Sequence, residues 1–155
     1  MRLAAEELGA SGQITVIDSA NLSTGIGLLV VEAAIMAKKN RTASEIVSEI
    51  EKLKPNVRAS FVVDTLTYLY RGGRCNAVAA MAGGVLKLHP KIVVEDGAMN
   101  ASKKYRGKIA SVILSYVKDM EKDLKNARQE RVFITHSGCD REIVETVRTY
   151  LKNLG

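Results

Sequence analysis

Short runs of β-branched residues alternate along this chain with longer segments of helical periodicity. The runs "QITVIDS" (13–19), "VRASFVVDT" (57–65) and "RVFITHSG" (131–138) predict strands. Helical patterns occupy residues 2–12, 25–39, 42–55, 106–127 and 140–154, and a small-residue segment at 76–84 is also predicted to be helical. Strands that alternate with helices predict an α/β fold, with helices on at least one face of a sheet.

Local signals support several of these elements. Thr42 with Glu45 three residues later is the capping-box pattern, and Pro55 follows the end of the same helix. Asp140 is the expected N-cap of the last helix. The segment "KIVVEDGAMNASKKY" predicts a hairpin that turns at Asp96–Gly97, so we expect a mixed sheet rather than a purely parallel one. The helix at 25–39 is apolar on most faces and is expected to be largely buried.

Composition limits the class of protein. The chain has 155 residues, of which 46% are apolar and 26% charged, and this balance is globular rather than disordered. The net charge of +6 comes without an arginine-rich tail, so we expect no nucleic-acid partner. Cys75 and Cys139 form no CxxC pair, which favours a reducing cytoplasm. The apolar run "IGLLVVEAAIMA" contains Glu32 and is too short to span a bilayer, and no signal peptide is expected.

Three loops follow predicted strands and carry polar side chains, and they are "DSANLSTGIG", "DTLTYLYRGGR" and "THSGCD". Ligands of open α/β sheets bind beyond the carboxyl ends of strands, so the three loops could form one site. In the first loop, the hydroxyl of Ser19 and the glycines Gly25 and Gly27 suit an anion at a helix N-terminus. An ordinary helix cap explains the same residues.

The second and third loops carry the cationic candidates. Arg71 and Arg74 flank Gly72–Gly73, whose freedom to take positive φ lets the two guanidinium groups point in different directions. A helix C-cap with two surface arginines is the alternative. His136 ends the last predicted strand, where it could meet a carboxylate or bond only to backbone.

Other polar and aromatic residues suggest no catalytic apparatus. His89 has no partner at metal-ligand spacing and is interpreted as structural or exposed, and Tyr68 and Tyr70 are interpreted as packing residues. The sequence contains no nucleophile elbow, no HExxH and no acidic cluster suited to magnesium. We therefore predict no metal, no cofactor and no enzymatic activity.

Several motifs in register resemble one family. The segments "VIDSANLSTGIGLLVVEAA", "FVVDTLTYLYRGGR" and "GGVLKLHPKIVVEDGAMNASKKYRGK" are similar to consecutive signatures of the DegV family of bacterial fatty-acid-binding proteins. Their order and spacing match from about Ile14 to Leu154. The resemblance implies two α/β domains with one long-chain fatty acid between them, its acyl chain in an apolar tunnel and its carboxylate near hydroxyls, an Arg and a His. It also implies a non-catalytic carrier that presents the fatty acid to a separate fatty acid kinase.

The resemblance also assigns domains. It implies that residues 1–55 are the end of an N-terminal domain and that residues 56–155 are the complete DegV C-terminal domain. The head-group hydroxyls of the family lie largely in a half that this sequence lacks, so we expect a truncated protein that binds weakly alone.

By motif position, Arg71 or Arg74 is the arginine near the head group or the kinase, and His136 is the head-group histidine. Candidates for the tunnel wall are Ile26, Leu66, Val85 and Ile92. His89 stands where the family usually has Lys, and Lys91 replaces an aliphatic residue. An inward Lys91 would disfavour an acyl chain, because an unpaired buried ammonium is costly.

Two other functions fit the same residues. An exposed interdomain face would be a large apolar patch, which predicts a self-associating module or homodimer without ligand. A kinase-like subunit of the dihydroxyacetone-kinase type is the third hypothesis, with His136 in the head-group region.

Overall fold

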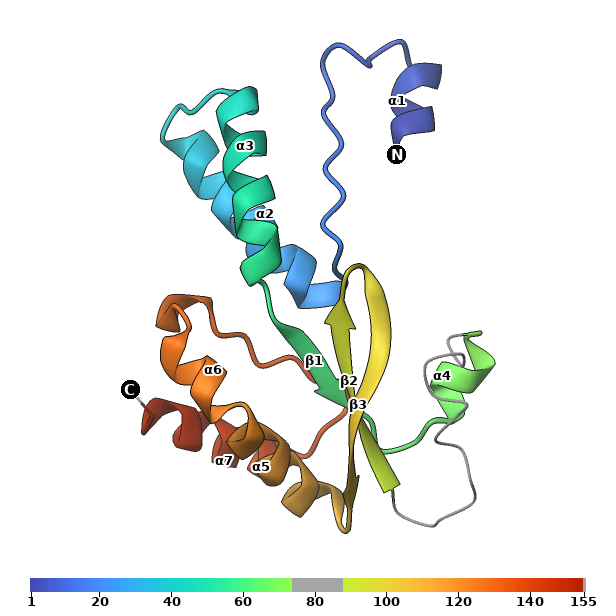
Figure 1. Ribbon diagram of the computed structural model, residues 1–155, viewed down its shortest axis with the longest axis vertical. Helices are drawn as coiled ribbons and strands as arrows, with labels where there is room; N and C mark the ends of the chain where they lie inside the picture. The colour runs from blue at the N-terminus through green and yellow to red at the C-terminus, as the bar shows by residue number, and fades with distance from the viewer. Residues whose placement is uncertain (74–87, 155) are drawn as a thin grey trace. The chain divides into compact units, whose positions relative to one another are not determined.

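The computed structural model describes residues 1–73 and 88–154, and Figure 1 shows their helices and strands. The predicted helix at 76–84 lies outside the described residues. The chain divides into two compact units. The first unit comprises Met1–Ala59 with Asp96–Ala98, and the second comprises Ser60–Glu95 with Met99–Gly155.

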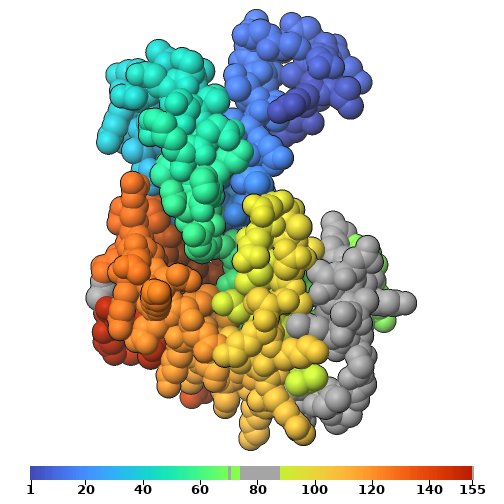
Figure 2. Space-filling view, viewed as in Figure 1, coloured from blue at the N-terminus to red at the C-terminus, as the bar shows by residue number. Residues whose placement is uncertain are grey.

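The first unit is helical. It contains α1 (Arg2–Glu7), α2 (Ser23–Lys38), α3 (Ala43–Leu53) and a short 3-10 turn at Lys54–Asn56. Helices α2 and α3 pack side by side, and Figure 2 shows them as adjacent cyan and green surfaces. The predicted capping box is confirmed, because Thr42 Oγ1 accepts from the backbone N–H of Glu45 and a Glu45 carboxylate oxygen accepts from the backbone N–H of Thr42.

The predicted strand at 13–19 is wrong. No described segment pairs with these residues, and a strand forms only where a neighbour accepts and donates its backbone hydrogen bonds. Its end makes a local turn instead, in which Asp18 Oδ1 accepts from the N–H of Ala20 at 2.9 Å. The next helix, α2, buries only Gly25 and Leu29, so the prediction of a largely buried helix is also wrong.

Gly25 is required by close packing. A Cβ built at this position would lie 1.8 Å from the side-chain oxygen of Asn21 and 3.2 Å from the Cβ of Ala59. The Asn21 side chain therefore occupies the space that any larger residue at position 25 would need. This contact explains why the first turn of α2 carries a glycine, without any bound anion.

The sheet has three strands in the order β1-β2-β3, with bounds Ala59–Val62, Leu88–Glu95 and Ala98–Arg106. The predicted hairpin is confirmed, and Asp96 and Gly97 both have positive φ (52° and 76°), as a type I′ turn requires. Figure 1 shows β1 and β2 running in opposite directions, so all three strands are antiparallel. The α/β class is confirmed, but the mixed sheet is wrong for the described strands, because the runs at 13–19 and 131–138 do not join it.

Helices of the second unit are α4 (Thr67–Arg71), α5 (Ile109–Asp119), α6 (Glu121–Asn126) and α7 (Arg141–Lys152). Helix α5 packs on β2 and on α7. The core lies at these contacts and includes Ile92, Val94, Val112, Val117 and Val147. The burial of these aliphatic side chains stabilises the unit by the transfer of apolar surface out of water.

Two expectations for this unit are corrected. The helix at 106–127 breaks at Met120 (φ −95°, ψ 2°), where Ser60 of β1 contacts the Met120 sulfur and fixes the last turn of α5 to the sheet. The run at 131–138 forms no strand and contains only the end of a 3-10 turn at Gln129–Arg131, because no described strand pairs with it. The prediction of Asp140 as the N-cap of α7 is confirmed, and its side chain makes no capping hydrogen bond. Within the described ranges, no helix has the length and apolar character needed to cross a membrane.

Candidate functional site

The loop from Thr65 to Gly73 follows β1 and carries the first predicted cationic residue. Thr65 Oγ1 accepts from the N–H of Thr67 at 3.2 Å and starts the single turn of α4. The N–H of Gly72 donates to Tyr68 O, and Gly73 takes φ +69°, so the glycines end the helix. Arg71 is the last residue of α4 and is exposed, so its guanidinium is accessible to an anion.

His89 fixes the start of this loop. It begins β2 beside Leu88 and is 4% exposed, the one buried polar residue of the described chain. Its Nδ1 lies 3.2 Å from Val63 O and its Nε2 lies 3.1 Å from Gly107 O. The carboxylate of Asp64 is 3.6 Å from Nδ1. The structural interpretation of His89 is confirmed, and the ring connects the ends of both outer strands.

The other predicted residues of the second unit differ in exposure. Leu66 is half-buried on the same loop as Arg71, Ile92 is a core residue that is 1% exposed, and His136 is exposed. Tyr68 is 74% exposed, so its predicted packing role is wrong as far as the described residues go, because the single turn of α4 leaves its ring on the surface. Arg74 and Val85 lie outside the described residues, and so does the side chain of Tyr70.

Two predicted residues lie in the first unit. Ser19 is half-buried, and its hydroxyl donates to Asn21 O at 3.3 Å and accepts from the Asn21 N–H at 3.2 Å. These bonds are local and form an ST-type turn. Ile26 on α2 is 40% exposed. The structure therefore brings Leu66 and Arg71 together on one loop and places Ser19 and Ile26 on a different unit.

A polar and aromatic network, which the sequence did not reveal, joins the sheet to α5. Tyr105 donates to Asp119 Oδ2 at 2.6 Å, and Lys103 donates to the same oxygen at 2.5 Å. The rings of Tyr105 and Tyr116 meet edge to face at 6.4 Å. Tyr116 in turn donates to Ser60 O at 2.8 Å. The only sequence signal is the spacing of Tyr116 and Asp119, which places them on one helix face.

The network perturbs its titratable groups. Donation from Lys103 and then from Tyr105 holds the pKa of Asp119 below its ordinary value, against a smaller effect of burial. Burial first, and the Asp119 carboxylate second, raises the pKa of Tyr105. Burial also raises the pKa of Tyr116, although the bond to Ser60 acts in the opposite direction. The two phenols therefore act as neutral donors.

Lys91 belongs to the same cluster. Its Nζ lies 5.7 Å from the ring centroid of Tyr116, at cation–π distance, and its charge helps to lower the pKa of Asp119. The residue is half-buried. Lys91 is thus only half-buried and lies at cation–π distance from an aromatic ring, so the cost expected for an unpaired buried ammonium does not arise here.

The lowered pKa of Asp119 predicts a loss of stability in acid. Because the folded-state pKa lies below the ordinary value of 3.8, the ion pair stabilises the fold above that pH and is lost as the pH falls through the folded-state value. We expect Asp119→Asn to be less stable than wild type at pH 7 and the difference to shrink below about pH 4. Urea midpoints followed by circular dichroism from pH 7 to pH 2.5 measure this. Glu95→Gln, at an exposed carboxylate, is the control. A difference in urea midpoint between wild type and Asp119→Asn that does not change with pH would contradict the prediction.

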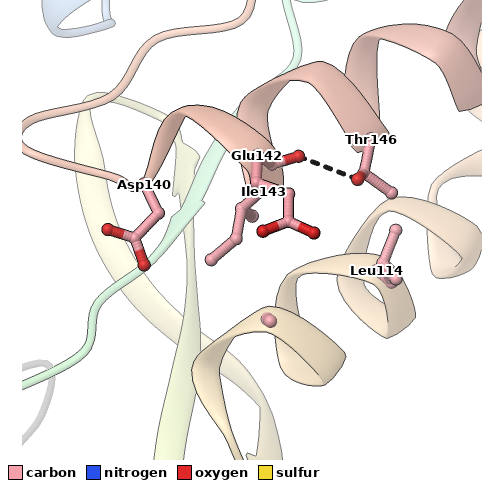
Figure 3. Close-up of a pocket in the computed structure, with 6 residues that line it drawn as sticks. Leu114, Asp140, Glu142, Ile143 and Thr146 are labelled. Atoms are coloured by element: carbon pink, nitrogen blue, oxygen red, sulfur yellow. Dashed lines mark hydrogen bonds between the residues drawn. The ribbon is translucent and has the colours of Figure 1, made fainter.

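A shallow groove lies between α5 and α7 (Figure 3) and has a volume of about 240 Å³. It is lined by Ala110, Leu114, Asp140, Glu142, Ile143 and Thr146. Thr146 donates to the backbone oxygen of Glu142 at 2.8 Å, drawn dashed in Figure 3. Two carboxylate side chains at its edge would repel a fatty-acid carboxylate, so this groove does not match the expected head-group site.

Comparison with known proteins shows a match over the whole chain. Residues 1–155 match a family model described as "Uncharacterised protein, DegV family". A DegV domain-containing protein of Caldanaerobacter subterraneus is 37% identical over 117 residues, which is 74% of this chain and 42% of that protein. One from Clostridium perfringens is 35% identical over 127 residues, which is 81% of this chain and 43% of that protein. The chain therefore spans less than half the length of these relatives.

Solved structures share the fold. A structure described as showing fatty acid binding of a DegV family protein from Thermus thermophilus has 25% identity and a TM-score of 0.67, covering 99% of this chain and 54% of that one. A structure described as a stearic-acid-binding protein from Eubacterium ventriosum has a TM-score of 0.75 and 22% identity, covering 98% of this chain and 52% of that one. The second likeness shows the fold alone.

Proposed function

Since this chain belongs to the DegV family, we propose that it binds a long-chain fatty acid as a non-catalytic carrier. The observation that carries the proposal is the similarity, over 99% of this chain, to the Thermus thermophilus protein described as binding fatty acid. The loop at 65–73 supports it, because that loop presents an exposed guanidinium, and guanidinium groups bind carboxylates with two parallel hydrogen bonds.

We assign the roles by position. Arg71 binds the carboxylate, and Arg74, Ser19 and His136 are further polar candidates around it. Leu66, Val85, Ile26 and Ile92 are the candidates for the acyl wall. The exposure of Arg71 and the half-buried position of Leu66 on the same loop support a site with a polar end and an apolar end.

The domain assignment is also a proposal. Residues 56–155 would form the second domain of the family and residues 1–55 the end of the first. The division of the structure into units at Ala59 and Ser60 supports this boundary. Each methylene of an acyl chain contributes about 0.8 kcal/mol when buried, and Ile26 at 40% exposure does not enclose one. We therefore expect affinity below that of the longer relatives.

The carrier would hand its fatty acid to a separate kinase that phosphorylates the carboxylate. A carrier needs a group that binds the carboxylate and leaves it accessible to the kinase, and the exposed Arg71 on the loop at 65–73 could act as such a group. A kinase-like subunit of the dihydroxyacetone-kinase type would need turnover by this chain itself, so phosphoryl transfer without an added partner separates it from a carrier.

Self-association is a second candidate that one observation favours. Large apolar side chains of the first unit are exposed, namely Met1, Leu3, Leu8, Ile14, Ile26 and Val30. Exposed apolar surface of this kind often marks a contact with another chain. A homodimer would cover it.

Native mass spectrometry tests both candidates. The chain is titrated with hexadecanoic acid, and hexadecan-1-ol, which has the same acyl length without a carboxylate, is the control. We expect one hexadecanoate per chain, with a Kd at least about tenfold above that of the Thermus thermophilus protein measured in parallel. A dimer without lipid would favour the self-associating module. No adduct at 100-fold molar excess of hexadecanoic acid would overturn the carrier proposal.

A further inference from the structure

We propose that His89 is a positioning residue for the loop that carries Arg71. Its Nδ1 fixes the carbonyl from which this loop leaves β1, and the fixed loop holds the guanidinium in the orientation that selects a carboxylate over a neutral head group. The proposal rests on the proposed function and adds a residue that never touches the ligand.

The geometry around the ring is the first support. His89 is buried, and each ring nitrogen faces one backbone carbonyl, Val63 O at 3.2 Å and Gly107 O at 3.1 Å. Val63 directly follows β1, and Gly107 directly follows β3. Because β2 is the central strand, one side chain joins the ends of both neighbours. Such a ring holds the two chain ends at a fixed separation.

The position of the proton on the His89 ring decides which carbonyl receives a hydrogen bond. Carbonyl oxygens only accept, and a neutral imidazole carries a single N–H, whereas an imidazolium carries two. The Asp64 carboxylate, 3.6 Å from Nδ1, favours a proton on that nitrogen. The Nδ1–H then donates to Val63 O, immediately before the loop begins.

Local hydrogen bonds connect the fixed carbonyl of Val63 to the turn that contains Arg71. Thr65 lies two residues after Val63, and its Oγ1 accepts from the N–H of Thr67 at 3.2 Å. Thr67 is the first residue of α4. At the other end of that single turn, the N–H of Gly72 donates to Tyr68 O at 3.0 Å. Arg71 lies within this turn, so a shift of Val63 moves the guanidinium with the helix.

Two substitutions separate the contacts of the two ring nitrogens. The side-chain amide nitrogen of asparagine reaches about as far as Nδ1, and that of glutamine about as far as Nε2. His89→Asn therefore keeps the donor to Val63 O, whereas His89→Gln removes that donor and places its amide beside Gly107 O. Val147→Ala, a cavity in the core at α7, is the control for a general loss of stability.

Amide hydrogen exchange, measured by NMR on the full chain, is the first readout. We expect exchange at Thr67 and Gly72 to rise about tenfold in His89→Gln and to stay within about twofold in His89→Asn. Exchange at Val112, whose N–H donates to Lys108 O just after Gly107, should stay within about twofold in both variants. Equal changes in the two variants, or none at Thr67 and Gly72, would overturn the proposal.

The second readout is the preference for a carboxylate, given by the Kd of hexadecan-1-ol divided by that of hexadecanoic acid. We expect this ratio to fall roughly tenfold in His89→Gln and to persist in His89→Asn and Val147→Ala. A ratio that falls equally in all three variants overturns the positioning role. If the wild-type chain binds no hexadecanoic acid, the proposed function fails, and the exchange measurement still decides whether Nδ1 of His89 anchors the loop.

Discussion

Replacement of Ile92 with alanine is expected to lower the free energy of unfolding by roughly 2–5 kcal/mol. Ile92 lies on the central strand and is 1% exposed, and with Val112 it is one of the two largest fully buried side chains among the described residues. The loss combines the removal of buried methylene and methyl groups from an apolar environment with the cavity that remains. A fall of this size is a large part of the total stability of an ordinary domain.

The matched control is another isoleucine of the same unit. Ile134 is 40% exposed, so Ile134→Ala should change the free energy by no more than about 0.5 kcal/mol. Urea unfolding followed by circular dichroism measures both variants. If Ile92→Ala left stability unchanged but abolished binding of hexadecanoic acid, Ile92 would be a cavity-wall residue rather than a core residue. Equal losses at the two positions would contradict the burial argument.

Elements set by local chemistry were predictable. The bonds between Thr42 and Glu45 join residues three apart, and the positive φ at Asp96 and Gly97 is a preference of those two residues in a tight turn. The helix end at Gly72–Gly73 has the same origin. In each case the interacting groups are neighbours in sequence, so the pattern contains the contact.

Elements that need distant partners were not predictable. The runs at 13–19 and 131–138 have the composition of strands, but a strand also needs a neighbour, and no described strand pairs with either run. The bond between Tyr116 and Ser60 spans 56 residues, and the bond of His89 to Val63 spans 26. Periodicity reports the face of an element, and it does not report which other element will meet that face.

The candidate site shows the same division. The arginine and glycines of the 65–73 loop were recognisable as a motif. The anchoring role of His89 was not, because its partners are backbone carbonyls, which every residue type carries. Ser19 was a candidate by residue type, yet its hydroxyl serves a local turn. Residue type alone does not distinguish a hydroxyl that binds a ligand from one that stabilises its own loop.

Arg71→Gln is expected to weaken the binding of hexadecanoic acid by roughly 10- to 100-fold, because a hydrogen bond to a charged group contributes about 1.5–3 kcal/mol. The binding of hexadecan-1-ol should be unchanged, since the alcohol offers no negative charge to the guanidinium. Arg71 is exposed at the end of α4, so the stability of the fold should stay within about 0.5 kcal/mol of wild type. Native mass spectrometry with both ligands measures the change. Lys104→Gln, at an exposed cation of β3, is the matched control for net charge, and equal losses in the two variants would indicate a general electrostatic effect.

The same substitution tests how Arg71 and His89 act together. If His89 acts on the ligand through the position of Arg71, its removal has nothing further to disturb once the guanidinium is gone. The double variant Arg71→Gln, His89→Gln should therefore lose no more carboxylate preference than Arg71→Gln alone, and the effects of the two single variants should not add. Additive losses would show that the two residues act independently. Arg71 would then still be the ligand-binding residue, but the orientation of its loop would have to be set by contacts other than the bond from His89 to Val63.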